Sequence, residues 1–139
     1  MSRIVVDTNV FVAALRTGGG ASREVLRRAL TGAYCPLFSN ALWLEYEDLL
    51  GRPVWTEETT GEERMNILAS LAAVGQWVKV YYGWRPNLVD EGDNHLIELA
   101  VAGGAKAIVT HNLRDLKFGE LRWRNLLVLS PSECLEKLK

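Results

Sequence analysis

The sequence contains few cysteines and no long apolar run, and each absence excludes a class of protein. Only Cys35 and Cys134 occur among 139 residues, far apart and without metal-ligand spacing. We therefore expect neither a disulfide scaffold nor a zinc site, but a reduced cytoplasmic protein. No apolar stretch approaches the ~20 residues that span a membrane, and the first apolar run is too short for a signal peptide. The chain is expected to be soluble.

The sequence also lacks an excess of either charge, with 16 basic and 17 acidic residues and a net charge of −1. This balance argues against bulk attraction to nucleic acid, which usually requires a basic surplus. It leaves open a locally positive groove, or a site in which a metal ion supplies the positive charge. No internal repeat and no linker rich in Pro, Gly or Ser divides the chain, so we expect one domain over residues 1–139.

Short apolar runs alternate with amphipathic helical patterns along the chain. The predicted strands are Ile4–Asp7, Tyr34–Phe38, Trp77–Tyr82, Ala107–Thr110 and Leu126–Leu129. The predicted helices lie at about 9–16, 22–31, 40–50, 61–74, 93–102 and 132–138. This alternation predicts an α/β fold, with a mostly parallel sheet of about five strands covered on both faces. Ligands of such sheets gather at the carboxyl ends of the strands.

Two acidic residues stand in apolar surroundings. Asp7 ends the first apolar run, where it could simply cap the next helix. Glu45 flanks a helical stripe of apolar residues, and a buried carboxylate there must find a partner, shift its pKa or bind a cation. The stripe consists of Leu42, Tyr46 and Leu49. The alternative for Glu45 is a side chain that bends out to water.

Two further acids complete a pattern. Asp93 precedes Leu96 and Ile97 at the head of a core-facing stripe, although an Asp at a helix N-terminus is also favoured by the helix dipole. Asp115 lies in the loop after the strand at 107–110, where a plain loop residue is the alternative. Clustered carboxylates repel one another strongly in a low dielectric, and a divalent cation relieves that repulsion. Oxygen ligands favour Mg²⁺ or Mn²⁺ over zinc.

The ordered set of segments resembles the PIN-domain ribonucleases. These segments are IVVDTNVF, LWLEYEDLL with its central glutamate, GDNHLIELAVAGGAKAIVTHNLRDL and LSPSECLEKL. The resemblance covers nearly the whole chain and is closest to the branch of toxins of type II toxin–antitoxin systems. It implies a three-layer α/β/α sandwich with a carboxylate pocket for Mg²⁺ or Mn²⁺.

The resemblance also implies roles for individual residues. It carries the family's acids onto catalytic and metal-binding positions Asp7, Glu45, Asp93 and Asp115. Supporting polar groups would be Thr8, Asn9, Thr110 and Asn112, and weaker candidates for RNA contact are Arg114 and Lys117. The chain departs from the family pattern at Asn112, where members often carry Asp, and the spacing to Asp115 is one residue longer. This departure puts a second metal site in question.

The function implied is metal-dependent hydrolysis of RNA by a toxin, with an antitoxin partner and a homodimeric assembly. The metal would lower the pKa of a bound water, and in-line attack would leave a 5′-phosphate and a 3′-hydroxyl. One alternative is a catalytically weak or inactive RNA-binding or interaction module. Another is an aspartyl-nucleophile phosphatase, which requires a second acid where this chain has Asn9.

Overall fold

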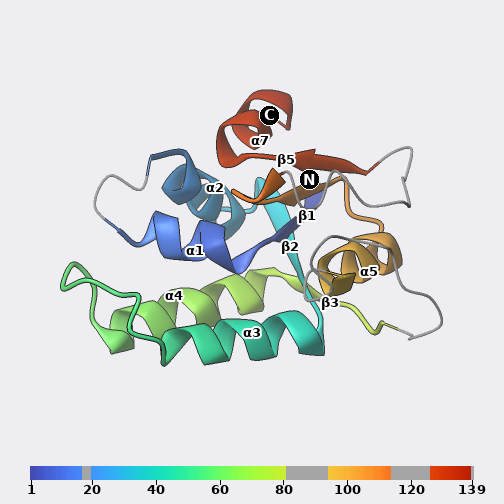
Figure 1. The fold of residues 1–139 in the computed structure, drawn as a ribbon. Coiled ribbons are helices and arrows are strands. Elements are labelled where there is room, and N and C mark those ends of the chain that lie inside the picture. Colours follow the sequence, from blue (N-terminus) through green and yellow to red (C-terminus); the bar gives the residue numbers. More distant parts are fainter. Residues whose placement is uncertain (17–19, 81–93, 114–125, 139) are drawn as a thin grey trace.

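A computed structural model of the chain describes residues 1–16, 20–80, 94–113 and 126–138. Five parallel strands form one sheet in the order β3-β2-β1-β4-β5 (Figure 1). The strands are β1 (Ser2–Val6), β2 (Tyr34–Phe38), β3 (Gln76–Trp77), β4 (Ala107–Val109) and β5 (Leu127–Leu129). The predicted α/β class and parallel sheet are confirmed.

Helices cover both faces of this sheet (Figure 1). They are α1 (Thr8–Ala14), α2 (Gly20–Leu30), α3 (Asn40–Leu50), α4 (Gly61–Val74), α5 (Asn94–Gly103) and α7 (Pro131–Lys137). Helix α2 packs against β2, α4 and α7, whereas α5 packs against β1, β2 and β4 from the opposite face. The result is the expected three-layer sandwich. No helix in the described ranges has the length and apolar character to cross a membrane.

Three strand predictions need correction at their carboxyl ends. The strand predicted at 77–82 is the edge strand β3, which ends at Trp77 because only Gln76 and Trp77 align with β2. The Val78 amide still donates a 2.8 Å hydrogen bond to the Phe38 carbonyl, but residues 78–80 belong to no strand, and 81–82 lie outside the described residues. Strands β1 and β4 end one residue before Asp7 and Thr110. Asp7 instead occupies the N-cap position of α1, in an extended conformation with φ −65° and ψ 147°, and its side chain makes no capping hydrogen bond.

Helix starts follow the local sequence. The hydroxyl of Thr60 accepts a 3.1 Å hydrogen bond from the Glu63 amide, and the Glu63 carboxylate accepts one of 2.9 Å from the Thr60 amide. Ser130 and Glu133 form the same reciprocal pair at α7. Each capping box satisfies backbone donors that a helix start leaves open, so both helices begin where the sequence predicts within one residue.

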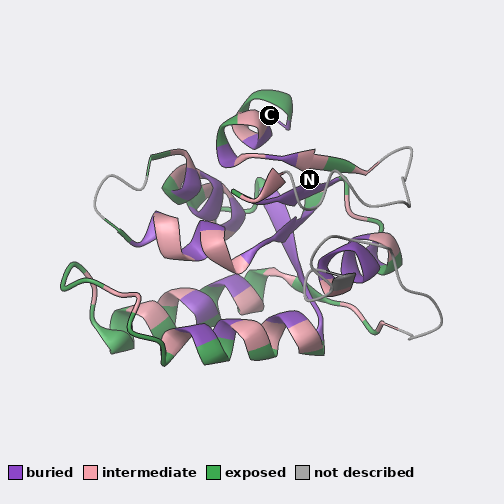
Figure 2. Ribbon diagram, viewed as in Figure 1, coloured by how far each residue is buried: buried purple, intermediate pink, exposed green. Residues whose placement is uncertain are grey.

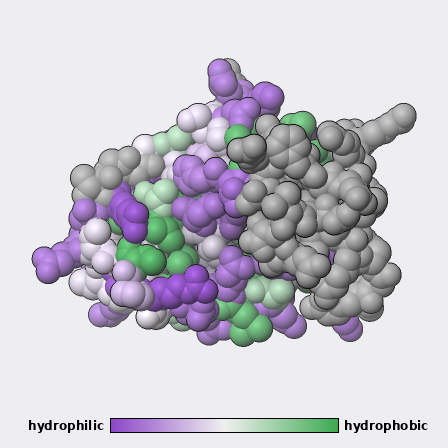
Figure 3. All heavy atoms as spheres, viewed as in Figure 1, coloured by the Kyte–Doolittle hydropathy of each residue, from purple (hydrophilic) through white to green (hydrophobic). Residues whose placement is uncertain are grey.

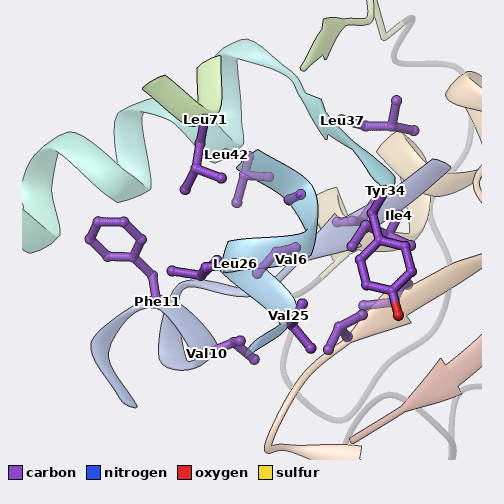
Figure 4. Close-up of a cluster of buried hydrophobic side chains, with 14 of the residues drawn as sticks. Ile4, Val6, Val10, Phe11, Val25, Leu26, Tyr34, Leu37, Leu42 and Leu71 are labelled. Atoms are coloured by element: carbon purple, nitrogen blue, oxygen red, sulfur yellow. The ribbon is translucent and has the colours of Figure 1, made fainter. Parts of the chain in front are cut away.

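The core lies on both faces of the central strands (Figure 2). Ile4 and Val6 of β1 pack with Val10, Val25 and Tyr34 from α1, α2 and β2 (Figure 4). The predicted stripe of α3 is buried as expected, consisting of Leu42, Tyr46 and Leu49. That stripe fixes the rotation of α3 about its axis, and therefore the direction in which Glu45 points.

Gly75 permits the close packing of α4 on the sheet. A Cβ atom at this position would lie 2.5 Å from the Pro36 carbonyl oxygen and 2.9 Å from a ring carbon of Phe38. Both distances are too short for a real side chain, so only glycine allows the end of α4 to approach β2 this closely.

Candidate active site

The ends of β1 and β4 meet at the point where the strand order reverses. From β1 the chain moves outward to β2 and β3, then crosses back to β4 on the other side of β1. Such reversal points are where open α/β sheets bind ligands. Val6 is aligned with Val109, and the Asp7 amide donates a 2.9 Å hydrogen bond to the Val109 carbonyl. Asp7 and Thr110 therefore leave the sheet side by side.

The Asp7 carboxylate is buried, with 6% of the residue exposed. Its Oδ2 accepts hydrogen bonds from the hydroxyl of Thr110 at 2.8 Å and from Nδ2 of Asn9 at 3.3 Å. The Thr110 hydroxyl in turn accepts hydrogen bonds from the main-chain amide of Asn112 at 2.9 Å and from Nδ2 of Asn9 at 3.4 Å. Because the hydroxyl has a single proton, its acceptor bonds direct that proton to Asp7.

Burial raises the pKa of the Asp7 carboxyl above its ordinary value. The Thr110 hydrogen bond opposes this rise by lowering the pKa, and the charge of Glu45 raises it further. Both the loss of water and a neighbouring like charge disfavour an ionised carboxylate. The described groups around Asp7 therefore offset the cost of ionising this carboxyl only in part.

Glu45 is placed beside Asp7 by the packing of α3. The hydroxyl of Tyr46 donates a 2.7 Å hydrogen bond to the Val6 carbonyl, which ties α3 to the end of β1. Burial raises the pKa of the Tyr46 phenol, and the charges of Asp7 and Glu45 raise it further, so both carboxylates act on this group. Tyr46 lies on the buried stripe, so its neighbour Glu45 is turned toward the strand ends.

Two side chains hold the Glu45 carboxylate, whose side chain is 33% exposed. Oε1 accepts a 2.9 Å hydrogen bond from the Thr8 hydroxyl, and Oε2 lies 2.7 Å from Nε2 of His95 on α5. The His95 hydrogen bond lowers the pKa of Glu45; burial raises it, and the Thr8 hydrogen bond lowers it again. Glu45 therefore has a strong partner, whereas Asp7 is the acid whose charge is less well compensated.

The sequence did not predict the contact between His95 and Glu45. His95 and His111, the two histidines of the sequence, are not spaced as a zinc-ligand pair, so no motif marks His95. Its partner lies 50 residues away on another helix, so no local pattern links the two. The one available signal was the position of His95 near the start of a core-facing helix.

Several predicted site residues fall in the described part of the chain. Thr8 and Asn9 each contact one of the two acids, Thr110 contacts Asp7, and Asn112 reaches Thr110 through its main chain. The predicted residues Asp93, Arg114, Asp115 and Lys117 lie outside the described residues. Within the described ranges, no three His, Cys, Asp or Glu residues are grouped to hold a metal ion.

The described donor set suits a hard divalent cation. Asp7 and Glu45 offer carboxylate oxygens, the ligands that Mg²⁺ and Mn²⁺ prefer. Burial and the charge of Glu45 raise the pKa of Asp7, and a cation beside both carboxylates would favour their ionised forms. The groups that hold each carboxylate leave its orientation fixed before any ligand arrives.

Comparison with known proteins identifies the fold. The chain is similar to a chain in the crystal structure of VapBC2 from Rickettsia felis bound to a DNA fragment from their promoter, with a TM-score of 0.58 and 15% identity. That match covers 91% of this chain and 96% of the other, and it shows a shared fold. The search of curated proteins gave no match. A family model described as the PIN domain matches residues 3–114, and the chain therefore belongs to the PIN domain family.

Proposed function

We propose that this protein is a metal-dependent ribonuclease that hydrolyses phosphodiester bonds with Mg²⁺ or Mn²⁺. The observation that carries the proposal is the convergence of Asp7 and Glu45, from a strand end and a separate helix, into one acidic site in which Asp7 is buried and Glu45 is half-buried. Membership of the PIN domain family supports it. Asp93 and Asp115 are proposed to complete the ligand set.

The protein groups orient the carboxylates for this chemistry. Thr110 and Asn9 fix Asp7, while Thr8 and His95 fix Glu45, so the oxygens are held in place by a shell of hydrogen bonds. A cation bound there would lower the pKa of a coordinated water and shield the negative phosphodiester. By its resemblance to the family, the reaction would leave a 5′-phosphate and a 3′-hydroxyl.

We further propose that the protein is a cytoplasmic, homodimeric toxin that an antitoxin neutralises. The resemblance to toxins of type II toxin–antitoxin systems and the structural likeness to VapBC2 support this assignment. Growth arrest on induced expression, relieved by co-expression of a small protein encoded beside it, would be the expected result. Soluble expression without arrest would contradict the toxin assignment.

One surface suits a helical partner of this kind. Helices α1, α2 and α4 enclose an apolar groove of about 320 Å³. Its lining includes Leu15, Leu26, Leu30 and Ile67, with Arg23 and Arg27 among its polar residues. Figure 3 shows apolar side chains gathered over α1 and α4 and surrounded by hydrophilic ones. An amphipathic helix with acidic flanks would complement this groove.

Cleavage of single-stranded RNA tests the catalytic proposal. Asp7→Asn and Glu45→Gln should each reduce the cleavage rate, because each removes a proposed metal ligand. The loss should exceed the ~10–100-fold that is typical when a residue hydrogen-bonded to a metal ligand is removed. Glu47→Gln is the matched control, since Glu47 is exposed on the same helix and should leave the rate unchanged. Chelation of the metal should abolish cleavage.

The same assay distinguishes the alternatives. Equal rates for the parent and Asp7→Asn would refute the nuclease assignment. RNA binding without cleavage at any metal concentration would favour the inactive binding module. Release of phosphate from a simple monoester would favour the phosphatase.

A further inference from the structure

A cleft of about 780 Å³ opens next to the acidic site. It shares Thr8 and Asn9 with that site and extends past the start of α2, the end of α3 and the start of α7. Its volume falls within the ~300–1,000 Å³ range of ligand-binding clefts. The cleft is therefore large enough for a ligand that also reaches Asp7.

The cleft has a positive lining although the whole chain carries a net charge of −1. Its ionisable lining residues are Arg16, Arg52 and His111, and no Asp or Glu from the described ranges lines it. This is a locally positive groove, of the kind that overall composition leaves open. It borders the site where the two carboxylates converge.

The two arginines reach the cleft from different segments. Arg16, just after α1, donates a 2.6 Å hydrogen bond to the Val54 carbonyl, and no described carboxylate forms an ion pair with it. Arg52, just after α3, pairs with the exposed Asp48, and its charge also lowers the pKa of Glu45. A guanidinium carries five donors in a fork that matches phosphate oxygens, so both side chains can bind further acceptors.

The lining of the cleft is tied to the acidic site through His111. Its main-chain amide donates to Oδ1 of Asn9 at 3.2 Å, and Asn9 in turn donates to Asp7. Its ring Nε2 lies 2.9 Å from the hydroxyl of Ser22, a residue that is 3% exposed. These hydrogen bonds fix the position of His111 in the cleft lining relative to the Asp7 carboxylate.

We infer that this cleft holds the RNA backbone beside the bond to be cut, with Arg16 and Arg52 binding its phosphates. The inference rests on the proposed ribonuclease function and adds the path of the substrate. Carboxylates that gather at the reaction centre repel the flanking phosphates, so a nucleic-acid strand requires cationic groups next to them. Arg16 and Arg52 are these cationic groups, and they line the same cleft as Asn9, which contacts Asp7.

Salt-dependent binding of a labelled single-stranded RNA oligomer tests the inference. The assay compares the non-cleaving Asp7→Asn protein with the same protein carrying Arg16→Gln and Arg52→Gln. We expect affinity to fall at least tenfold, and the slope of log K against log salt to decrease by about 0.7 for each phosphate that an arginine no longer neutralises. Lys106→Gln is the control, because Lys106 is exposed just before β4, at the end of that strand away from Thr110 and the cleft.

The outcomes separate this inference from the proposed function. No RNA binding by the Asp7→Asn protein, or equal slopes in the double variant and the Lys106→Gln control, would overturn the inference. So would binding of a polyglutamate peptide with the same arginine dependence, which would make the cleft a protein-docking surface. Arginine-dependent binding in a protein that never cleaves would uphold the cleft and refute the nuclease.

Cleavage kinetics provide a second readout on the otherwise unchanged protein. If the parent cleaves RNA, Arg16→Gln with Arg52→Gln should raise KM more than it lowers kcat, and an unchanged KM would overturn the inference while the nuclease stands. Because Arg16 also contacts the Val54 carbonyl, Arg52→Gln alone is the second variant, and thermal unfolding checks that each protein is folded.

Discussion

The hydroxyl of Thr110 donates a 2.8 Å hydrogen bond to Oδ2 of Asp7, joining two residues 103 positions apart in the chain. Both groups are buried and stand at the ends of neighbouring parallel strands. The bond lowers the pKa of a carboxyl that burial raises. Thr110 therefore controls both the orientation and the ionisation of the acid that we place at the centre of the site.

Thr110→Val should shift the acid limb of the pH–rate profile to higher pH. Without the hydroxyl, the pKa of Asp7 rises further, and the ionised form that binds a cation is lost at a higher pH. Thr110→Ser should restore the parent profile, because it retains the donor. Thr31→Val is the control, since the Thr31 hydroxyl donates to the Arg28 carbonyl on an exposed turn, away from the acidic site. An unchanged acid limb in Thr110→Val would contradict this role.

Asp7→Asn should stabilise the metal-free protein at neutral pH while abolishing cleavage. The pKa of Asp7 is raised above its ordinary value of 3.8, so the folded state holds this proton more tightly than the unfolded state. Stability then falls as the pH rises through the interval between the two pKa values, and the ionised group is a net cost above it. The difference between variant and parent should vanish below pH 3.8.

Thermal unfolding in the presence of a chelator measures this effect at acidic and neutral pH. Addition of Mn²⁺ should raise the melting temperature of the parent and leave that of the variant nearly unchanged, because bound ligand stabilises only the state that binds it. A variant that is less stable than the parent at neutral pH would refute the burial argument.

His95→Ala should raise the metal concentration needed for half-maximal cleavage by about 10–100-fold. His95 holds Oε2 of Glu45 and is the main cause of its lowered pKa, so its removal frees the carboxylate to rotate and weakens its ionisation. Because the pKa of Glu45 is lower in the folded protein than its ordinary value of 4.5, its interaction with His95 stabilises the fold above pH 4.5. This stabilisation is lost as the pH falls through the pKa of Glu45 in the folded state. His95→Gln should show a smaller effect, since its amide can still donate.

Leu42→Ala should lower the free energy of unfolding by about 2–5 kcal/mol. Leu42 is 1% exposed on the buried stripe of α3, and truncation there leaves a cavity. Leu44→Ala, on the same helix but 63% exposed, should change stability by less than about 0.5 kcal/mol. Denaturant unfolding of both variants measures the difference. Equal costs would mean that α3 does not present the face that directs Glu45 to the site.

Gly75→Ala should cost about 1–3 kcal/mol of stability. The added methyl group would meet the Pro36 carbonyl oxygen at 2.5 Å, and a main-chain atom of β2 cannot move aside. Gly61→Ala, at the first residue of α4, is the control, because its nearest neighbour is the flexible Arg64 side chain at 3.8 Å. The control should unfold at the same or a higher denaturant concentration than the parent, and a matching loss of stability in both variants would exclude the steric explanation.

The sequence alone determined the order of the helices and strands, and it predicted a site at the carboxyl ends of the strands. Alternation of apolar runs with helical stripes predicted five parallel strands, and α3 and α4 have the predicted bounds. The stripe of α3 placed Glu45 at the boundary of the core, and the apolar run before Asp7 placed that acid at a strand end. These features depend on preferences between residues a few positions apart, which a single chain displays directly.

Only the tertiary structure decided which side chains meet. His95 with Glu45, Thr110 with Asp7, and the two arginines of the cleft come from segments that strand order and helix packing bring together. The short β3 likewise follows from its edge position, where only two residues align with β2. Local pattern does not encode such pairings, because the contact depends on how whole elements pack and not on the spacing of residues within one of them.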